Sequence, residues 1–303
     1  MRKIAIVGMS CNLPGDINDL RKLLSALRER RVTADTVPKD RWDMARYYSN
    51  DEASKGKSYV EKGNFLQHDI RSMDAEFFDL PASVAENIDP QQRLLLELTW
   101  EAFENAGLNL PAHSGRKVGV YVGGFMLDQM VTMTHFANRT RQNANTPSGM
   151  MMTMLANRLS HAFNLRGPSL SIDTACSSSL VAFSYACNDI WSGECDMAVV
   201  GGANIMTRPE YPIGMCKGHF LSRDGQCKSF DARGDGYGRG EGGGVVIIKA
   251  LEQALLDGDT ILATVEGAGV NSDGRTPGIS LPSAEAQGAL IQDVCTRFDI
   301  DPA

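Results

Sequence analysis

Apolar and polar positions along the chain follow two different periods, and these periods predict the elements of the fold. Short runs rich in valine, isoleucine and alanine are typical of buried strands, and they occur at residues 4–7, 117–124, 169–173, 197–203, 245–249 and 261–265. Apolar positions recur at helical spacing in residues 18–31, 90–107, 180–190 and 283–298. Strands that alternate with helices predict a layered α/β fold.

Local signals predict how some of these elements begin and end. Asp89 suits the N-cap and Pro90 the first position of a helix that Gly107 closes. We therefore interpret this segment as a capped structural helix rather than as a source of catalytic groups. Residues 9–15 are expected to form a turn, and the polar, irregular residues 32–80 are expected to form a long surface segment.

Cys176 is the candidate nucleophile, because it lies where a predicted strand meets a predicted helix. The run is Asp173-Thr-Ala-Cys-Ser-Ser-Ser-Leu180. A cysteine in the first turn of a helix lies beside unpaired backbone N–H groups and the positive end of the helix dipole, which favour the reactive thiolate. The alternative is that Cys176 is a small buried apolar residue, as most cysteines are. Its position alone leaves both interpretations open.

A glycine-rich run at residues 231–244 invites comparison with phosphate-binding loops. Such a loop follows a strand and opens a helix, so that phosphate meets the helix N-terminus. Here the order is reversed, because the glycines precede the predicted strand at 245–249, and the lysine followed by Ser or Thr is missing. The run also lacks the acidic spacing of a calcium loop. We expect it to allow positive φ angles and close backbone packing.

Methionine is concentrated in one stretch, with seven in residues 126–154. Methionine fills irregular apolar space, so we expect a role in the core or at a subunit interface.

Composition narrows the class of protein. The chain of 303 residues is 43% hydrophobic, which is enough for a sizeable core, and its formal net charge of −7 without a basic run argues against nucleic acid as a partner. The seven cysteines are odd in number and include no Cys-x-x-Cys pair, which predicts neither disulfides nor a metal site. No apolar run approaches the roughly 20 residues that span a bilayer. We expect a cytoplasmic protein with no membrane association.

Several phrases together resemble one family. The run at 173–180 resembles the active-site motif of ketosynthase (β-ketoacyl synthase) domains of type I polyketide synthases, members of the thiolase superfamily. The same resemblance extends to Asp-Pro-Gln-Gln-Arg at 89–93, Leu-Arg-Gly-Pro-Ser at 165–169, the glycine run at 231–244, and Gly-Ala-Gly-Val-Asn-Ser-Asp-Gly at 267–274. It covers essentially the whole chain.

The resemblance implies a thiolase-like layered αβαβα fold of two similar halves, of which the C-terminal half is incomplete in this chain. Residues 1–255 would form the N-terminal half with the nucleophilic cysteine, and residues 256–303 the start of the truncated C-terminal half. By family spacing, the motif His-Gly-Thr-Gly-Thr is expected roughly ten residues beyond Ala303. We expect the isolated chain to expose apolar surface and to lack condensing activity.

The resemblance also implies a reaction. Cys176 would accept an acyl group from the phosphopantetheine arm of an acyl carrier protein, and decarboxylative Claisen condensation with a malonyl-type thioester would follow in the intact domain. No cofactor would bind directly, and the intact domain would be a homodimer. Neither His161 nor His219 stands in a family histidine motif, so we assign neither as a base.

Two alternatives remain. One is a ketosynthase-like gatekeeping domain that binds an acyl chain without extending it. The other is a generic α/β hydrolase, which is disfavoured because the chain has no Gly-x-Ser-x-Gly nucleophile elbow.

Overall fold

The computed structural model describes residues 3–302. Its centre is a mixed six-stranded sheet with the order β5-β4-β6-β7-β1-β8. Both β5 and β6 run parallel to β4, while the contacts β6–β7, β7–β1 and β1–β8 are antiparallel. The strands are β1 (Ile4–Asn12), β4 (Val118–Gly123), β5 (Ser169–Ile172), β6 (Met197–Asn204), β7 (Gly242–Ala250) and β8 (Ala263–Val265).

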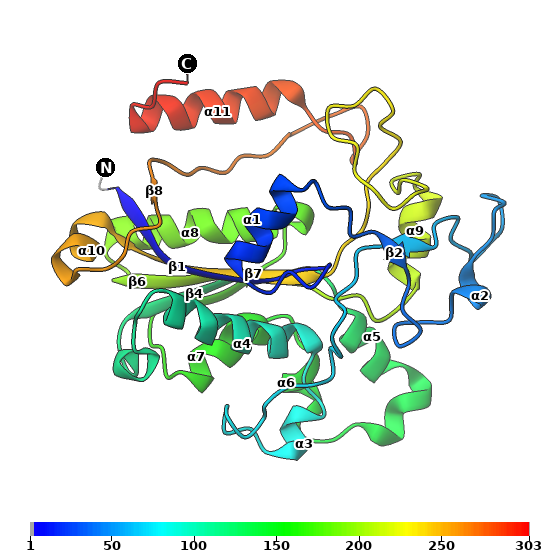
Figure 1. Cartoon of the computed structure of the whole chain (residues 1–303), viewed down its shortest axis with the longest axis horizontal. Helices are drawn as coiled ribbons and strands as arrows, with labels where there is room; N and C mark the ends of the chain where they lie inside the picture. Colours follow the sequence, from blue (N-terminus) through cyan, green and yellow to red (C-terminus); the bar gives the residue numbers. More distant parts are fainter. Residues whose placement is uncertain (1–2, 303) are drawn as a thin grey trace.

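Helices cover both faces of this sheet (Figure 1). One face carries α4 (Pro90–Asn105) and α7 (Met154–Ala162), and the other carries α8 (Ser178–Ser192), with α11 (Ala284–Phe298) beyond it. Shorter helices connect these elements: α1 (Leu20–Arg28), α2 (Met44–Tyr47), α3 (Ala82–Ala85), α5 (Asp128–Thr134), α6 (Thr146–Met150), α9 (Glu210–Lys217) and α10 (Leu251–Asp257). The predicted α/β fold is confirmed.

The two faces of the sheet hold separate apolar cores because successive strand residues point to opposite sides. The core under α4 and α7 includes Leu95, Val120 and Ile247, and the core under α8 includes Tyr121, Ala182 and Ile248. Both cores are closed to solvent.

The helix signals in the sequence are confirmed in detail. Asp89 caps α4 and accepts a hydrogen bond from Gln91 N at 2.7 Å, and Pro90 opens the helix. The predicted helix at 283–298 is α11, where Ser283 caps the first turn. Leu290, Val294 and Phe298 form its packed side, since a Cβ placed on Gly267 or Gly269 would meet these side chains.

Four expectations about boundaries were wrong. The strand predicted at 245–249 begins at Gly242, because the last glycines of the run pair with β1 and β6. The predicted strand at 4–7 continues to Asn12, because residues 8–12 pair with β7 across a register shift between Ile6 and Gly8, so there is no turn at 9–12. The first helix starts at Leu20 with Asp19 as its cap, later than residue 18, and ends at Arg28. The last strand starts at Ala263 rather than at 261.

Residues 32–80 are less of a surface segment than predicted. They contain the two-stranded pair β2 (Asp35–Thr36) and β3 (Lys62–Gly63), and several of their side chains are buried. Trp42 and Phe65 pack edge to face with ring centroids 5.8 Å apart. Burial of these aromatic rings anchors the segment beside the C-terminal ends of the central strands, and it helps to form the site described next.

Candidate active site

Cys176 lies in a 3₁₀ turn, Ala175–Ser177, between the end of β5 and the start of α8. The predicted strand-to-helix junction is confirmed, although Cys176 precedes the α-helix by two residues instead of lying in its first turn. The side chain is exposed. The alternative of a small buried apolar residue is therefore wrong for this cysteine, whereas Cys187 and Cys195 fit it.

Hydrogen bonds between residues close in sequence hold this turn in shape. Ala175 N donates to Asp173 Oδ1 at 3.0 Å, and Ser177 Oγ donates to Thr174 O at 2.9 Å. Ser178 Oγ accepts from Thr174 N and donates to Ala175 O. These contacts keep Ala175 at a φ of +54°, a left-handed conformation that an alanine rarely adopts. The strained residue directly precedes Cys176 and sets the sharp bend that projects its side chain into solvent.

Two glycines let the start of α8 approach the sheet. A Cβ on Gly123 would lie 2.3 Å from Ser179 N, and a Cβ on Gly202 would lie 2.9 Å from Ser179 Cβ. Both glycines lie at the C-terminal ends of parallel neighbours, β4 and β6. The position of Cys176 therefore depends on backbone contact that no larger residue allows.

Tyr211 of α9 lies within electrostatic range of Cys176, which the sequence did not indicate. Burial raises the pKa of its phenol, and the nearby Cys176 and Asp173 raise it further, whereas Arg239 lowers it. The Tyr211 ring lies 5.5 Å from the ring of Phe125 and 4.8 Å from the guanidinium carbon of Arg239. Tyr211, Phe125 and Arg239 thus form an aromatic and cationic wall within electrostatic range of the cysteine.

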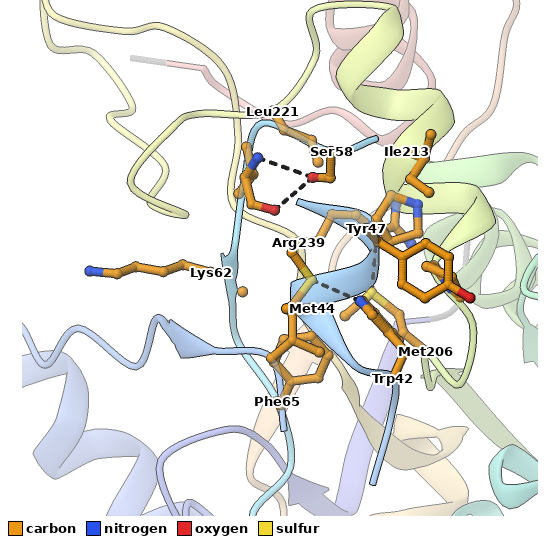
Figure 2. Close-up of a pocket in the computed structure, with 15 residues that line it drawn as sticks. Trp42, Met44, Tyr47, Ser58, Lys62, Phe65, Met206, Ile213, Leu221 and Arg239 are labelled. Carbon is orange, nitrogen blue, oxygen red and sulfur yellow. Dashed lines mark hydrogen bonds between the residues drawn. The ribbon is translucent and has the colours of Figure 1, made fainter. Parts of the chain in front are cut away.

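A narrow apolar pocket lies behind this wall. Arg239 lines it together with side chains from two distant parts of the chain, and Figure 2 shows them converging. Trp42, Met44 and Phe65 come from the segment at 32–80, and Met206 follows β6. The Trp42 Nε1 donates to Met44 Sδ at 2.9 Å.

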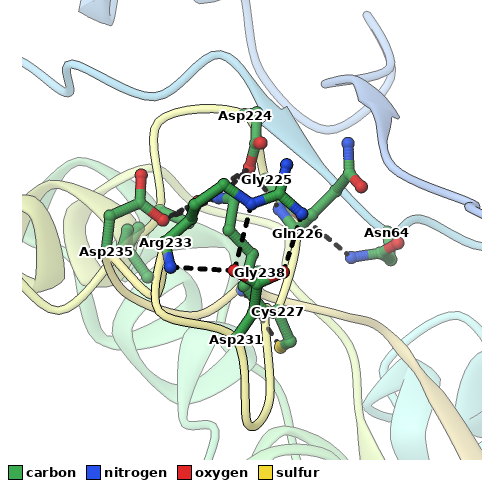
Figure 3. Close-up of polar contacts among 12 residues, drawn as sticks. Asn64, Asp224, Gly225, Gln226, Cys227, Asp231, Arg233, Asp235 and Gly238 are labelled. Carbon is green, nitrogen blue, oxygen red and sulfur yellow. Dashed lines mark hydrogen bonds and ion pairs between the residues drawn. The ribbon is translucent and has the colours of Figure 1, made fainter.

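Residues 222–241 form a compact loop that is held by charges (Figure 3), and the last glycines of the run, at 242–244, already belong to β7. Lys228 Nζ lies 2.9 Å from Asp224 Oδ1 and 2.6 Å from Asp235 Oδ1. A hydrogen bond from Ser222 and the contact with Lys228 lower the pKa of Asp224 to about 2. Lys228, followed by Ser222, also lowers the pKa of Asp235.

The predicted close packing of the glycine run is confirmed at Gly238. A Cβ there would lie 1.9 Å from Gly225 O, so the two backbone segments touch. Because the run leads into β7 rather than into a helix, its geometry is not that of a phosphate-binding loop.

The other residues that the sequence analysis weighed as catalytic groups make ordinary structural contacts or lie at the surface. Arg93 donates to backbone carbonyls, including those of Ala85 and Ile88 at 3.0 and 3.1 Å, which confirms its interpretation as part of a structural helix. His219 Nδ1 lies 3.8 Å from Glu52 Oε2 at the surface, and His161 is exposed in the last turn of α7. No group of His, Cys, Asp or Glu in residues 3–302 could hold a metal ion.

Of the methionines at 126–154, only Met126 is buried, and Met152 is partly buried against the core, so a core role holds for these two. A role of the others at a subunit interface stays a prediction. All seven cysteines are free thiols, as predicted. Within residues 3–302, no helix is both long enough and apolar enough to cross a bilayer.

Comparison with known families identifies the family to which the chain belongs. The profile of the family "Beta-ketoacyl synthase, N-terminal domain" matches residues 1–254. The chain belongs to the β-ketoacyl synthase family. The predicted resemblance to ketosynthase domains of polyketide synthases is thereby confirmed.

The relatives of this ketosynthase chain are large fungal enzymes. It is 42% identical over 291 residues to the partially reducing polyketide synthase tpeA of Talaromyces stipitatus, with 96% of this chain and 12% of that protein covered. It is 45% identical over 289 residues to the highly reducing polyketide synthase 19 of Pyricularia oryzae, with 95% and 11% covered. The chain thus spans about an eighth of the length of these relatives.

Solved ketosynthase structures match the whole chain. The ketosynthase domain OzmH KS7 of oxazolomycin biosynthesis from Streptomyces albus JA3453 has a TM-score of 0.94 at 39% identity, and covers 100% of this chain and 51% of that chain. The ketosynthase from module 6 of the bacillaene synthase of Bacillus subtilis 168 has a TM-score of 0.88 at 37% identity, with 99% and 49% covered. This agreement confirms the thiolase-like fold class.

Sequence reasoning missed Tyr211, Phe125, Arg239 and Trp42 as parts of the site. Their signals were present but weak: Arg239 is an arginine inside a glycine run, and Trp42 is a large aromatic residue inside a polar segment. Only the folded chain brings these positions together.

Proposed function

We propose that this chain supplies the acyl-accepting part of a condensing ketosynthase, with Cys176 as the nucleophile. The exposed position of Cys176 on a strained turn carries the proposal, because a thiol presented in this way can reach a thioester bound at the surface. Membership of the β-ketoacyl synthase family supports the reaction class.

The first step is transfer of an acyl group between two sulfur atoms. The Cys176 thiolate attacks the carbonyl carbon of an acyl thioester, and the tetrahedral intermediate then breaks its bond to the donor sulfur. The acyl group remains on Cys176 Sγ, and the donor leaves as a thiolate that takes up a proton. The backbone N–H of Cys176 would donate to the developing oxyanion, which is the usual way such an intermediate is stabilised.

The proposed donor is the phosphopantetheine arm of an acyl carrier protein, and no cofactor binds the chain itself. In the intact domain, a malonyl-type thioester would lose CO₂ and its carbanion would attack the acyl-Cys176 carbonyl, which forms the carbon–carbon bond and releases the cysteine. The two relatives described above are both polyketide synthases, which favours this condensing role over gatekeeping.

The setting of the domain is also a proposal. We place the N-terminal half at residues 1–255 and the start of the second half at 256–303, which the family match over residues 1–254 supports. We further propose a homodimer that acts in the cytoplasm. We expect the isolated 303 residues to lack condensing activity. We also expect them to associate through exposed apolar side chains such as Leu180, which is 75% exposed.

Mass spectrometry of acyl adducts tests the nucleophile. The protein is incubated with a hexanoyl thioester of pantetheine, and the modified peptide is identified after digestion. We expect one adduct at Cys176, lost in Cys176→Ala and retained in Cys227→Ala, because Cys227 is the matched exposed cysteine. An adduct that persists in Cys176→Ala would show that another residue is the nucleophile.

A further inference from the structure

Arg239 is a buried cation without an acid partner. The residue is only 8% exposed, and no carboxylate among residues 3–302 lies within ion-pair distance of its guanidinium. Its neighbours are weak acceptors: Nε contacts Met206 Sδ at 3.2 Å, Nη2 contacts Met126 Sδ at 3.5 Å and Nη1 contacts Tyr237 Oη at 3.4 Å. Thioether sulfur accepts hydrogen bonds poorly.

The nearest acid in the sequence, Glu241, is already engaged. Its carboxylate accepts hydrogen bonds from Nε and Nη2 of Arg41, both at 2.8 Å. It also accepts from the backbone N–H groups of Leu66 at 2.9 Å and Met206 at 3.1 Å. These four donors saturate the carboxylate. Glu241 therefore neutralises Arg41 and leaves the charge of Arg239 uncompensated.

Aromatic rings compensate Arg239 only in part. Its guanidinium carbon lies 4.8 Å from the Tyr211 ring and 6.0 Å from the Phe125 ring. A cation–π contact returns less free energy than the removal of a full charge from water costs, so buried charges in proteins are normally paired. Tyr211 is also 37% exposed, which weakens its contribution. Among residues 3–302, the charge of Arg239 therefore has no full counter-charge, which a bound anion would supply.

The size of the pocket that Arg239 lines limits the size of an anion that could bind there. Arg239 lines the apolar pocket of Figure 2, among Trp42, Met44, Phe65 and Met206. The free space there accommodates a body of about the size of one water molecule and not an extended chain. We propose that Arg239 binds a small monovalent anion, of the size of chloride, in this pocket. The proposal is independent of the role of Cys176.

Bromide locates such an anion directly, because it replaces chloride and scatters anomalously. Crystals of the full polypeptide are soaked in sodium bromide, and we expect an anomalous peak within hydrogen-bond distance of the Arg239 guanidinium. Absence of a peak at Arg239 would overturn the proposal. A structure in which a carboxylate of a longer polypeptide occupies the position would also overturn it.

Thermal unfolding in solution tests the same site. At equal ionic strength, we expect the melting temperature in sodium chloride to exceed that in sodium gluconate by about 2 °C at a tenfold excess of chloride over its Kd, since gluconate is too large for the pocket. Arg239→Met should abolish the difference, because it matches the neighbouring thioethers and removes the charge. The control Arg233→Met, at an exposed arginine paired with Asp231, should keep it.

The outcomes of these experiments distinguish an anion bound at Arg239 from one bound elsewhere or from none. A chloride effect that persists in Arg239→Met would overturn the proposal, because the ion would then bind elsewhere. If Arg239→Met fails to fold, fluorescence of the wild-type protein decides: bromide should quench Trp42, which lines the pocket, and Trp42→Phe should remove the saturable part of the quenching. Quenching that rises linearly with bromide and never saturates would count against a bound anion.

Discussion

Arg41 and Glu241, which are 200 residues apart in the sequence, form a buried two-point ion pair. Their side chains are 1% and 0% exposed. The pair fastens the segment at 32–80 to the start of β7, and through the Met206 N–H it also holds the chain after β6. A single carboxylate thus joins the three segments that line the apolar pocket at Arg239.

This relationship predicts a large effect of Arg41→Met. The variant leaves the Glu241 carboxylate buried with only backbone donors, and we expect the free energy of unfolding to fall by about 3–5 kcal/mol, as for other broken buried pairs. Denaturant titration measures the loss. The double variant Arg41→Met with Glu241→Gln should lose less than the sum of the two single changes, because it leaves no unpaired charge. Additive losses would contradict the proposed coupling.

Gly123→Ala should displace the start of α8. The added Cβ would lie 2.3 Å from Ser179 N, a backbone atom that cannot move alone. We expect a loss of stability of about 1–3 kcal/mol from overpacking and slower alkylation of Cys176 by iodoacetamide. Gly214→Ala in α9 is the control, because an added Cβ there meets nothing within 4 Å and should stabilise the helix by about 0.5–1 kcal/mol. A tolerated Gly123→Ala would show that α8 adjusts freely.

Asp89 should make stability depend on pH. Burial raises its pKa from 3.8 to about 6, so the folded protein retains a proton that the unfolded chain releases between about pH 4 and 6. The resulting stabilisation is complete below pH 4 and is lost as the pH rises through 6.

Asp89→Asn isolates this contribution, because the amide oxygen can still accept from Gln91 N. We expect the variant to match the wild type near pH 4 and to exceed it at pH 7.5 by an amount on the order of 3 kcal/mol, the value of about two pKa units. Urea titrations at both pH values measure it. The control Asp19→Asn, at the exposed cap of α1, should not show a gain of this size. Equal differences at both pH values would refute a buried, protonated Asp89.

Lys228 should control the ionisation of the loop at 222–235. Hydrogen bonding to Ser222 and Lys228 holds the pKa of Asp224 near 2, so the stabilisation is present above the ordinary value of 3.8 and is lost as the pH falls towards 2. Lys228→Met should raise the pKa of Asp224 and of Asp235, and a ¹³C-detected NMR titration of the carboxyl carbons measures both. Lys228→Arg should restore most of the lowering. Unchanged titrations in Lys228→Met would show that Lys228 does not contact these acids in solution.

Local patterns predicted the parts of the molecule that local physics governs. The cap at Asp89, the strand before Cys176 and the packed side of α11 follow from hydrogen-bonding preferences and from the spacing of apolar residues, which neighbouring positions specify. The end of β1 was misjudged because Met9–Asn12 becomes a strand only through pairing with β7, which lies more than 230 positions later.

The sequence by itself determined the family, the order of the main strands and of four helices, and the cysteine at the strand-to-helix junction, because these depend on motifs and periodicities a few residues long. Only the tertiary structure decided that Ala175 is held at positive φ, that Cys176 helps to raise the pKa of Tyr211, and that Arg239 lies buried without an acid partner among residues 3–302. Each of these features depends on contacts between distant segments. A pattern along the chain records which residues are apolar or charged, whereas burial and pairing are decided by what the fold places around them.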